Sequence, residues 1–462
     1  MAEKNAIPTE LGTEKIGVLL KQYALPAIIA QTASSLYNMV DSIFIGQGVG
    51  PLAISGLAVT FPLMNLSTAF GTLVGVGAST MLSVLLGQKN YKGANKVLGN
   101  VVTLNTIIGI VFMAVALIFI DPILYFFGAS ENTLPYAKEY ITIILIGNVI
   151  THLYFGLNAA MRSSGHPKKA MGLTIFTVAF NTILDPIFIF GLDMGISGAA
   201  WATVIAQFAA MILVIRHFND RKKPFHFEKG IFRLDMRVAK DSLAIGMGPF
   251  LMNSAACLVT LFINQQLRKY SGDLGIGAYG ICNRFVFMFI MICMGLNQGM
   301  QPIAGYNYGA RQYSRVKEVF WKTARLAMIM TTICFIFGIF FPRLAVGIFT
   351  HDEQLLDMGA KALRVMTLVF PIVGFQMIST NFFQCLGMVN KSIILSLSRQ
   401  LLFLLPLLYM LPLWYGSNGV WYSFPIADTI STLLTVLLIG RLFKKFSTLK
   451  DGDDPSILGS KL

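Results

Sequence analysis

The same pattern of residues occurs twice in this 462-residue chain, about 222 positions apart. The matched pairs are Gly87 and Gly309, Tyr91 and Tyr313, Val97 and Val319, Gly165 and Gly387, and Lys169 and Lys391. A constant offset near half the chain length indicates a duplicated unit. The fold must therefore consist of two similar halves.

The composition indicates what surrounds those halves. Hydrophobic residues make up 55% of the chain and charged residues 13%, and the mean hydropathy is +0.67. So little polar surface predicts an all-α polytopic membrane protein, with twelve transmembrane helices in two six-helix lobes. The predicted spans are 24–46, 54–86, 97–120, 134–161, 170–191, 195–216, 241–267, 276–306, 319–341, 359–385, 391–414 and 419–441.

The number of spans in each copy predicts how the lobes are related. Because six is even, both copies enter the membrane in the same orientation, and a pseudo-twofold axis along the membrane normal relates them. We expect an N-terminal lobe at 1–216, a cytoplasmic linker at 217–240, and a C-terminal lobe with a cytoplasmic tail at 241–462. A cleft between such lobes would favour alternating access over a pore.

The formal net charge of +14 could suggest nucleic-acid binding, but the basic residues follow the topology. Of the 36 Lys and Arg, 28 lie in every second loop and at the two ends, and six lie in the other loops. The positive-inside rule therefore predicts cytoplasmic termini and a multi-pass protein of the inner (plasma) membrane. We expect the lipid bilayer as a partner, no nucleic acid, and a monomer.

Acidic residues lie in apolar runs chiefly in the first copy. At about 1.5 Å per residue, Asp41 and Asp185 lie roughly 7 Å below the outer ends of the first and fifth spans, and Thr203 of the sixth reaches the same level. Tyr37 and Asn181 precede the two aspartates by four residues and so share their helix faces. The sequence predicts that these five residues form one polar layer.

A carboxylate in an apolar span is costly unless it takes up a proton or binds a cation. Asp41 is therefore predicted to accept a proton, and Asp185, with Asn181 and Thr203, to form an oxygen cage for a monovalent cation. Sodium could bind at Asp41, Asn181, Asp185 and Thr203. The alternative is that both acids are structural groups bonded to helix ends.

Several segments resemble the multidrug and toxic compound extrusion (MATE) family across nearly the whole chain. The matching segments are ALPAIIAQTASSLYNMVDSIFIGQ, GQKNYKGANKVLGN, MRSSGHPKKAM, NTILDPIFIFGLDMGISGAAWATVIAQ and QPIAGYNYGARQYSRVKE. The resemblance implies twelve helices and export of bulky organic cations or other amphiphilic, drug-like compounds. It also implies that an inward proton or sodium gradient drives export, with no cofactor beyond that coupling ion.

The resemblance also implies roles for the polar layer. Family branches that couple through the first lobe use an aspartate matched by Asp41 and an asparagine and aspartate matched by Asn181 and Asp185. A nearby tyrosine and threonine are matched by Tyr37 and Thr203. Other branches use acids of the seventh and tenth helices, which this chain lacks.

Further polar residues are candidates for the substrate cavity. These are Asn158, Gln301, Gln376 and Asp428, and each could instead bond between helices. Pro26 interrupts the first helix and is a candidate hinge, with a static kink as the alternative. Arg399 is expected to pair with carbonyls or to extend outward.

The function expected from these features is antiport of drug-like compounds. A flippase for lipid-linked or lipid-like substrates is the alternative, and it would need a cationic cleft. We do not expect an enzyme, because no HExxH, Walker A or Ser/His/Asp arrangement occurs.

Overall fold

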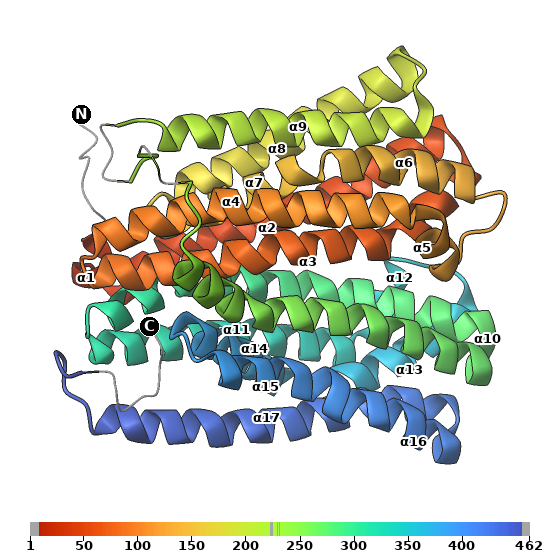
Figure 1. Ribbon diagram of the computed structural model, residues 1–462. Helices are drawn as coiled ribbons and strands as arrows, with labels where there is room; N and C mark the ends of the chain where they lie inside the picture. The colour runs from red at the N-terminus through yellow and green to blue at the C-terminus, as the bar shows by residue number, and fades with distance from the viewer. Residues whose placement is uncertain (1–8, 222–224, 229, 231, 455–462) are drawn as a thin grey trace. The chain divides into compact units, whose positions relative to one another are not determined.

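The computed structural model describes residues 9–221, 225–228, 230 and 232–454, without the side chains of residues 37–39, 46, 51, 54 and 273. All regular secondary structure in this part of the chain is helical. Within each half of the chain the long helices run side by side (Figure 1). The prediction of an all-α protein is confirmed.

Contacts divide the chain into two compact units. Unit 1 comprises Met1–Thr13 and Ile29–Phe250, and unit 2 comprises Glu14–Ile28 and Leu251–Leu462. The two cuts lie 222 residues apart, since 250 minus 28 is 222, so the first helix of each repeat is divided at the equivalent residue. The predicted limits 1–216, 217–240 and 241–462 follow the repeats instead, and stay a prediction.

The first repeat forms the helices that precede the linker. They are α1 (Glu10–Thr13), α2 (Ile16–Gly48), α3 (Pro51–Gly87), α4 (Tyr91–Ile118), α5 (Ile120–Phe126), α6 (Leu134–Ile146), α7 (Asn148–Ser163), α8 (Pro167–Pro186), the π-helix η1 (Ile187–Gly191) and α9 (Gly195–Phe218).

The second repeat has a corresponding series. It comprises α10 (Met236–Gly309), α11 (Tyr313–Phe340), α12 (Pro342–Gly347), α13 (Glu353–Thr367), α14 (Phe370–Cys385), α15 (Val389–Leu397), the π-helix η2 (Ser398–Leu404), α16 (Leu405–Tyr415) and α17 (Ser417–Ser447). A non-helical Gly272 divides α10 into two spans.

The predicted spans agree with these helices. In the described part of the chain, nine helices are long and apolar enough to cross a membrane, and two bent pairs raise the number to as many as eleven. The remaining predicted span, 24–46, lies inside α2, which has 33 residues. Apolar runs of this length thus predicted the membrane architecture correctly.

The backbone repeats as the sequence does. Lys89 and Arg311 both have a positive φ, 60° and 57°, in the turns after α3 and α10. Gly165 and Gly387 also share a positive φ, 94° and 67°, before α8 and α15. Positive φ is uncommon for residues other than glycine. The duplication therefore preserved backbone conformation as well as helix order.

Glycines allow equivalent helices to approach closely in each unit. In unit 1, a methyl group at Gly77 of α3 would collide with the backbone of Ser242 in the first part of α10. In unit 2, a methyl group at Gly299 would collide with Ala24 of α2. Gly77 and Gly299 are also 222 residues apart, so both units use small residues to hold the divided helices.

The predicted fourth and tenth spans are not straight. The α6–α7 pair bends by 53° at Gly147, and the α13–α14 pair bends by 55° before Pro371. Proline in the first turn of α14 cannot continue the preceding helix, because its nitrogen has no hydrogen to donate. The short helices α5 and α12, and both π-helices, were also not predicted.

The first turns of α4 and α11 are capped differently. The Asn90 side chain accepts a hydrogen bond from the Gly93 backbone at 2.9 Å, which is a local N-cap. The equivalent Gln312 makes no such bond. Instead, the Asp451 carboxylate after α17 accepts from the Ser314 backbone at 2.9 Å and from its hydroxyl at 2.5 Å. The C-terminal segment thus completes a helix more than a hundred residues earlier.

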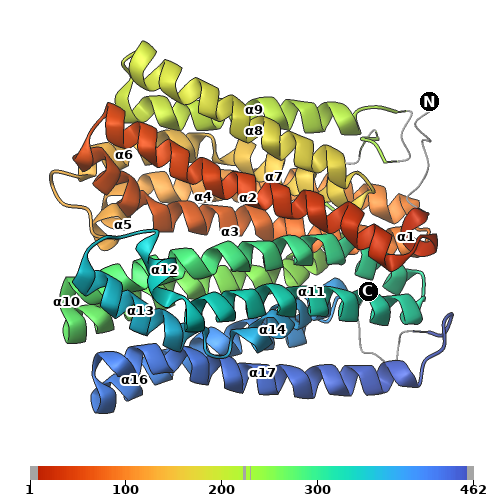
Figure 2. The same ribbon diagram turned by 180° about the vertical axis from the view of Figure 1, so that it is seen from behind.

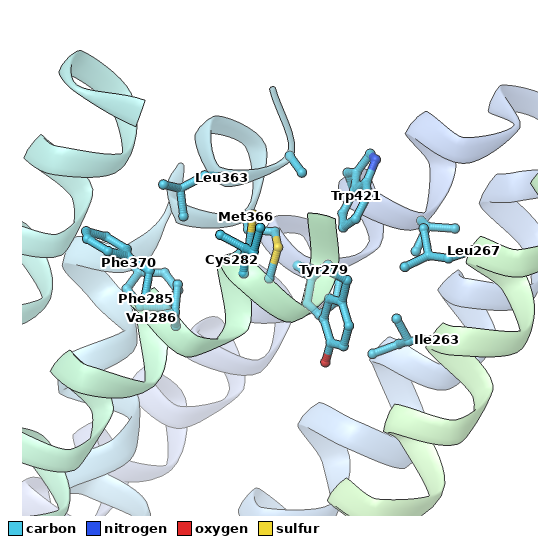
Figure 3. Packing of buried hydrophobic residues seen from close by; sticks show 14 of the residues in the cluster. Ile263, Leu267, Tyr279, Cys282, Phe285, Val286, Leu363, Met366, Phe370 and Trp421 are labelled. Atoms are coloured by element: carbon cyan, nitrogen blue, oxygen red, sulfur yellow. The ribbon is translucent and has the colours of Figure 1, made fainter. Parts of the chain in front are cut away.

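Unit 2 contains a large apolar core formed by both spans of α10 with α13, α14 and α17. Figure 3 shows Cys282, Phe285 and Met366 packed together in this core. Tyr279 lies at its edge and stacks on Phe424 of α17, with the ring centroids 6.1 Å apart. This core packs the spans of unit 2 against one another.

Candidate acidic site

Two aspartates of unit 1 lie on neighbouring helices. Asp41 belongs to α2 and is 5% exposed, whereas Asp185 belongs to α8 and is fully buried. Figure 2 shows α2 and α8 adjacent. Phe44 of α2 and Phe190 of η1 meet edge to face, with centroids 6.5 Å apart. The prediction that both acids lie within the apolar spans is consistent with this placement.

The local sequence of α8 explains the position of Asp185. Pro167 starts the helix, where its missing N–H costs nothing, and Pro186 follows the aspartate. Beyond Pro186 the chain continues as the π-helix η1. A π-turn widens the helix and often occurs at functional sites. Asp185 therefore lies in the last turn of α8, one residue before Pro186 and the change to π-helical geometry.

The two carboxylates act on each other and on a shared amide. Asp41 lies close enough to Asp185 for their charges to repel. Asn181, one turn before Asp185, lies beside its carboxylate and donates to the Thr203 hydroxyl of α9 at 3.2 Å. Four of the five residues of the predicted polar layer are therefore gathered. The side chain of the fifth, Tyr37, lies outside the described residues, although its backbone is in α2.

The site contains more acceptors than donors. Among the described residues, no hydrogen-bond donor reaches four of its buried oxygens: Oδ1 of Asp41, Oδ1 of Asn181, and both carboxylate oxygens of Asp185. A buried acceptor without a partner costs free energy, and a buried charge costs more. A proton or a cation at this position would satisfy these acceptors.

The donor set limits which cation could bind. All the available groups are carboxylate, amide or hydroxyl oxygens, which suit hard cations. Within the described ranges, no group of three or more His, Cys, Asp or Glu could hold a metal ion. The oxygens of Asp41, Asn181, Asp185 and Thr203 are of the kind that would suit a hard cation such as sodium.

Four residues were predicted to line a substrate cavity, and all four are buried. Asn158 donates to the Tyr154 hydroxyl at 3.2 Å and to the Thr174 hydroxyl at 3.3 Å, which joins α7 to α8. Gln376 donates to Ser431 and joins α14 to α17. Gln301 is 4% exposed. In this conformation Asn158 and Gln376 connect helices, and the cavity role stays a prediction, as does the hinge at Pro26 inside α2.

Asp428, the fourth cavity candidate, is involved in an interaction that the sequence did not predict. Its carboxylate accepts a hydrogen bond from Nε of Arg399 at 2.5 Å. The expectation that Arg399 pairs with carbonyls or extends outward was wrong, because a buried carboxylate lies within its reach. The signal that could have predicted the pair was an acid and a cation in successive apolar spans of the second copy.

Two repeats with ionisable groups buried among apolar spans are typical of membrane transporters. The MatE family model matches residues 26–187 and 245–410. The chain belongs to this family, the MATE transporters, and is a transporter rather than an enzyme. The resemblance inferred from the sequence is confirmed.

Relatives match nearly the whole chain. The multidrug export protein MepA of Staphylococcus aureus (strain MRSA252) is 28% identical over 420 residues, which are 91% of this chain and 92% of MepA. The structure of the MATE multidrug transporter DinF-BH, solved as a complex, has a TM-score of 0.87 and 36% identity, covering 95% of this chain and 98% of that one.

A second solved structure supports the fold alone. An outward-facing MATE family transporter of the MOP superfamily has a TM-score of 0.89 at 22% identity, covering 97% of this chain and all of that one. The chain is thus a multi-pass membrane protein, and its bacterial relatives indicate the plasma membrane.

Proposed function

We propose that this MATE transporter is a cation-coupled multidrug antiporter of the plasma membrane. The observation that carries the proposal is the set of four buried acceptor oxygens at Asp41, Asn181 and Asp185 without a donor among the described residues. Such a site is stabilised by a bound positive charge. The relatives named for multidrug export support drug-like compounds as substrates.

Exchange follows from competition for this negative site. When Asp41 and Asp185 are both ionised, their repulsion disfavours the empty site. A proton or a sodium ion relieves that repulsion, and so does an organic cation held near the same carboxylates. Because one carboxylate cluster cannot satisfy both at once, binding of the coupling ion weakens binding of the drug.

Coupling to movement requires that the two ligands prefer different conformations. A ligand shifts a conformational equilibrium only by the difference between its affinities for the two states. Two repeats that alternately expose a shared path to each side of the membrane are the expected frame for such alternating access. Entry of the ion from outside would then favour release of the drug there.

The coupling ion is a proton or sodium, and we propose no other cofactor. The oxygens of Asp41, Asn181, Asp185 and Thr203 suit either ion, since a carboxylate can be protonated and an oxygen cage can hold sodium. The substrates proposed are amphiphilic compounds, organic cations in particular.

The test uses the full-length protein in proteoliposomes loaded with a fluorescent organic cation. A proton gradient and a sodium gradient are imposed separately, and dye movement and counter-movement of the ion are recorded. One gradient should drive transport in the wild type and fail in Asp41→Asn. Dye movement that neither gradient changes would refute coupling, and equal transport by wild type and Asp41→Asn would remove the site from it.

A further inference from the structure

The ion pair between Arg399 and Asp428 in unit 2 differs in accessibility between its two members. The Asp428 side chain is 2% exposed, whereas that of Arg399 is 31% exposed. Arg399 lies in η2 and Asp428 in α17. The carboxylate is therefore inaccessible, and only the guanidinium of the pair can contact another molecule.

The guanidinium retains donors that the pair does not use. Nε donates to Asp428, and this is the hydrogen bond that Arg399 makes within the part of the chain that the structure describes. The two terminal nitrogens carry four further N–H groups in a planar fork. A fork of this kind matches the two oxygens of a carboxylate.

The exposed part of Arg399 does not belong to the lipid-facing side of its helix. That side is marked by Ile394, Leu402 and Tyr409, which are all strongly exposed apolar or aromatic side chains. Arg399 instead lies near Tyr279 of α10, which is 8% exposed. A guanidinium facing lipid would be costly. Its accessible surface is therefore assigned to a side of the helix that does not face lipid.

Two hydroxyl groups accompany the guanidinium. Thr260, on the other span of α10, is exposed and lies beside the Tyr279 hydroxyl. Figure 3 shows that hydroxyl directed away from Trp421. The surroundings are thus an apolar, aromatic wall with a cation and two hydroxyl groups at its edge. An amphiphile with an anionic group has the complementary chemistry.

We propose that Arg399 binds the carboxylate of zwitterionic amphiphiles that the transporter exports, with Asp428 as the positioning residue. Asp428 holds Nε and so turns the terminal nitrogens of the fork toward the accessible side. This inference rests on the proposed export function and assigns recognition of a carboxylate on the substrate to one residue pair of unit 2. The Tyr279 hydroxyl lies near the same group, whereas the Thr260 hydroxyl donates to the Ala256 carbonyl at 2.8 Å.

Two dyes that differ by one ester group test the proposal. Rhodamine 123 is a cationic methyl ester, and rhodamine 110 is the corresponding free acid. Transport of each is measured with the full-length protein in proteoliposomes under the gradient that drives export. The double variant R399Q/D428N removes both charges together, so that no buried charge is left unpaired.

We expect R399Q/D428N to lower the rate of rhodamine 110 transport at least tenfold and to keep that of rhodamine 123 within twofold. Arg399→Lys, which keeps the charge but loses the fork, should fall between the double variant and wild type for rhodamine 110. Arg284→Gln is the matched control, because it removes an exposed arginine of α10 in the same unit, and it should leave both rates within twofold.

The outcomes separate the two proposals. Equal effects of R399Q/D428N on both dyes, or no effect on the acid, would overturn the role of Arg399. Transport of rhodamine 123 without any transport of rhodamine 110 by the wild type would also overturn it. Failure of the wild type to move rhodamine 123 under either gradient would instead count against the proposed export function.

Discussion

The fifth helix of each repeat carries an ionisable residue next to or within a π-helix, but the charges are opposite. In unit 1, Asp185 precedes η1 and faces a second acid, Asp41. In unit 2, Arg399 lies within η2 and faces an acid, Asp428. The duplicated backbone was thus retained while its electrostatics diverged. Among the described residues, buried carboxylate oxygens of unit 1 have no donor, whereas the carboxylate of Asp428 in unit 2 is paired with a cation.

The largest predicted effect tests whether the ion pair between Arg399 and Asp428 stabilises unit 2. Arg399→Gln leaves the Asp428 carboxylate buried without its cation, and we expect the free energy of unfolding to fall by about 3–5 kcal/mol. The measurement is thermal unfolding of the purified protein in detergent. R399Q/D428N should recover most of the loss, and a loss of the same size in the double variant would show that the pair is not what stabilises the unit.

The next prediction concerns the acidic site of unit 1 and its effect on transport. Asp41→Asn removes the carboxylate that takes up the coupling ion in the proposed mechanism, and we expect the rate of gradient-driven dye export to fall by about 100-fold or more, which is about 2.7 kcal/mol. Expression should be unchanged. Asp193→Asn is the control, because it neutralises an exposed acid of the same unit. Comparable losses in both variants would argue against a special role for the buried position.

The third prediction is that loss of a charge stabilises unit 1, whereas loss of a charge destabilises unit 2. Asp185→Asn replaces a repelling carboxylate with an amide that can donate to Asp41, so we expect the protein to become more stable by about 1–3 kcal/mol even as transport declines. Thermal unfolding measures the gain. It is recorded at pH 8, where both aspartates are ionised in the unfolded protein and burying their charges costs most free energy. A clear destabilisation would mean that Asp185 is bonded structurally, as the alternative interpretation of the sequence holds.

The smallest predicted effect concerns the N-terminal caps of α4 and α11, which differ between the two repeats. Asp451→Ala should cost about 0.5–1 kcal/mol, because α11 loses the cap that Asn90 supplies locally to α4. Partial burial raises the pKa of Asp451, but the hydrogen bonds from Ser314 outweigh it and hold that pKa below its ordinary value. The cap is therefore complete above an ordinary aspartate pKa of about 3.9 and is lost as the pH falls through the lower pKa of the folded protein.

This difference can be measured by hydrogen exchange at the start of α11 in wild type and Asp451→Ala. Protection in the wild type should decline below about pH 4, while the variant should show low protection throughout. Identical pH profiles for the two proteins would contradict the cap.

Much of this architecture could be predicted from local sequence. Long apolar runs specify spans, and the spacing of four residues placed Asn181 and Asp185 on one face because helical periodicity is a local property. The bends at Gly147 and before Pro371 were not predicted, since a glycine or proline permits a bend but tertiary packing decides whether one forms. The π-helices likewise depend on packing against neighbouring helices.

The two charged sites differ in how far the sequence reveals them. Asp41 and Asp185 are conspicuous because acids are rare in apolar spans. The bond between Arg399 and Asp428 was missed because the residues are 29 positions apart and lie on different helices, and a π-turn changes the direction of the arginine. The same limit applies to the cap of α11, which joins residues far apart in the chain.

The division of the first helix in each repeat has a consequence for how the protein is made. Unit 1 requires residues up to Phe250, which belong to the second repeat, and unit 2 requires Glu14–Ile28, which are synthesised first. A ribosome that has finished the first six spans has therefore not yet produced a complete unit, while an early segment waits for the last spans. Biogenesis must keep that segment in the bilayer unassembled, so expression of the two repeats as separate chains should yield fragments that reach their folded state only together.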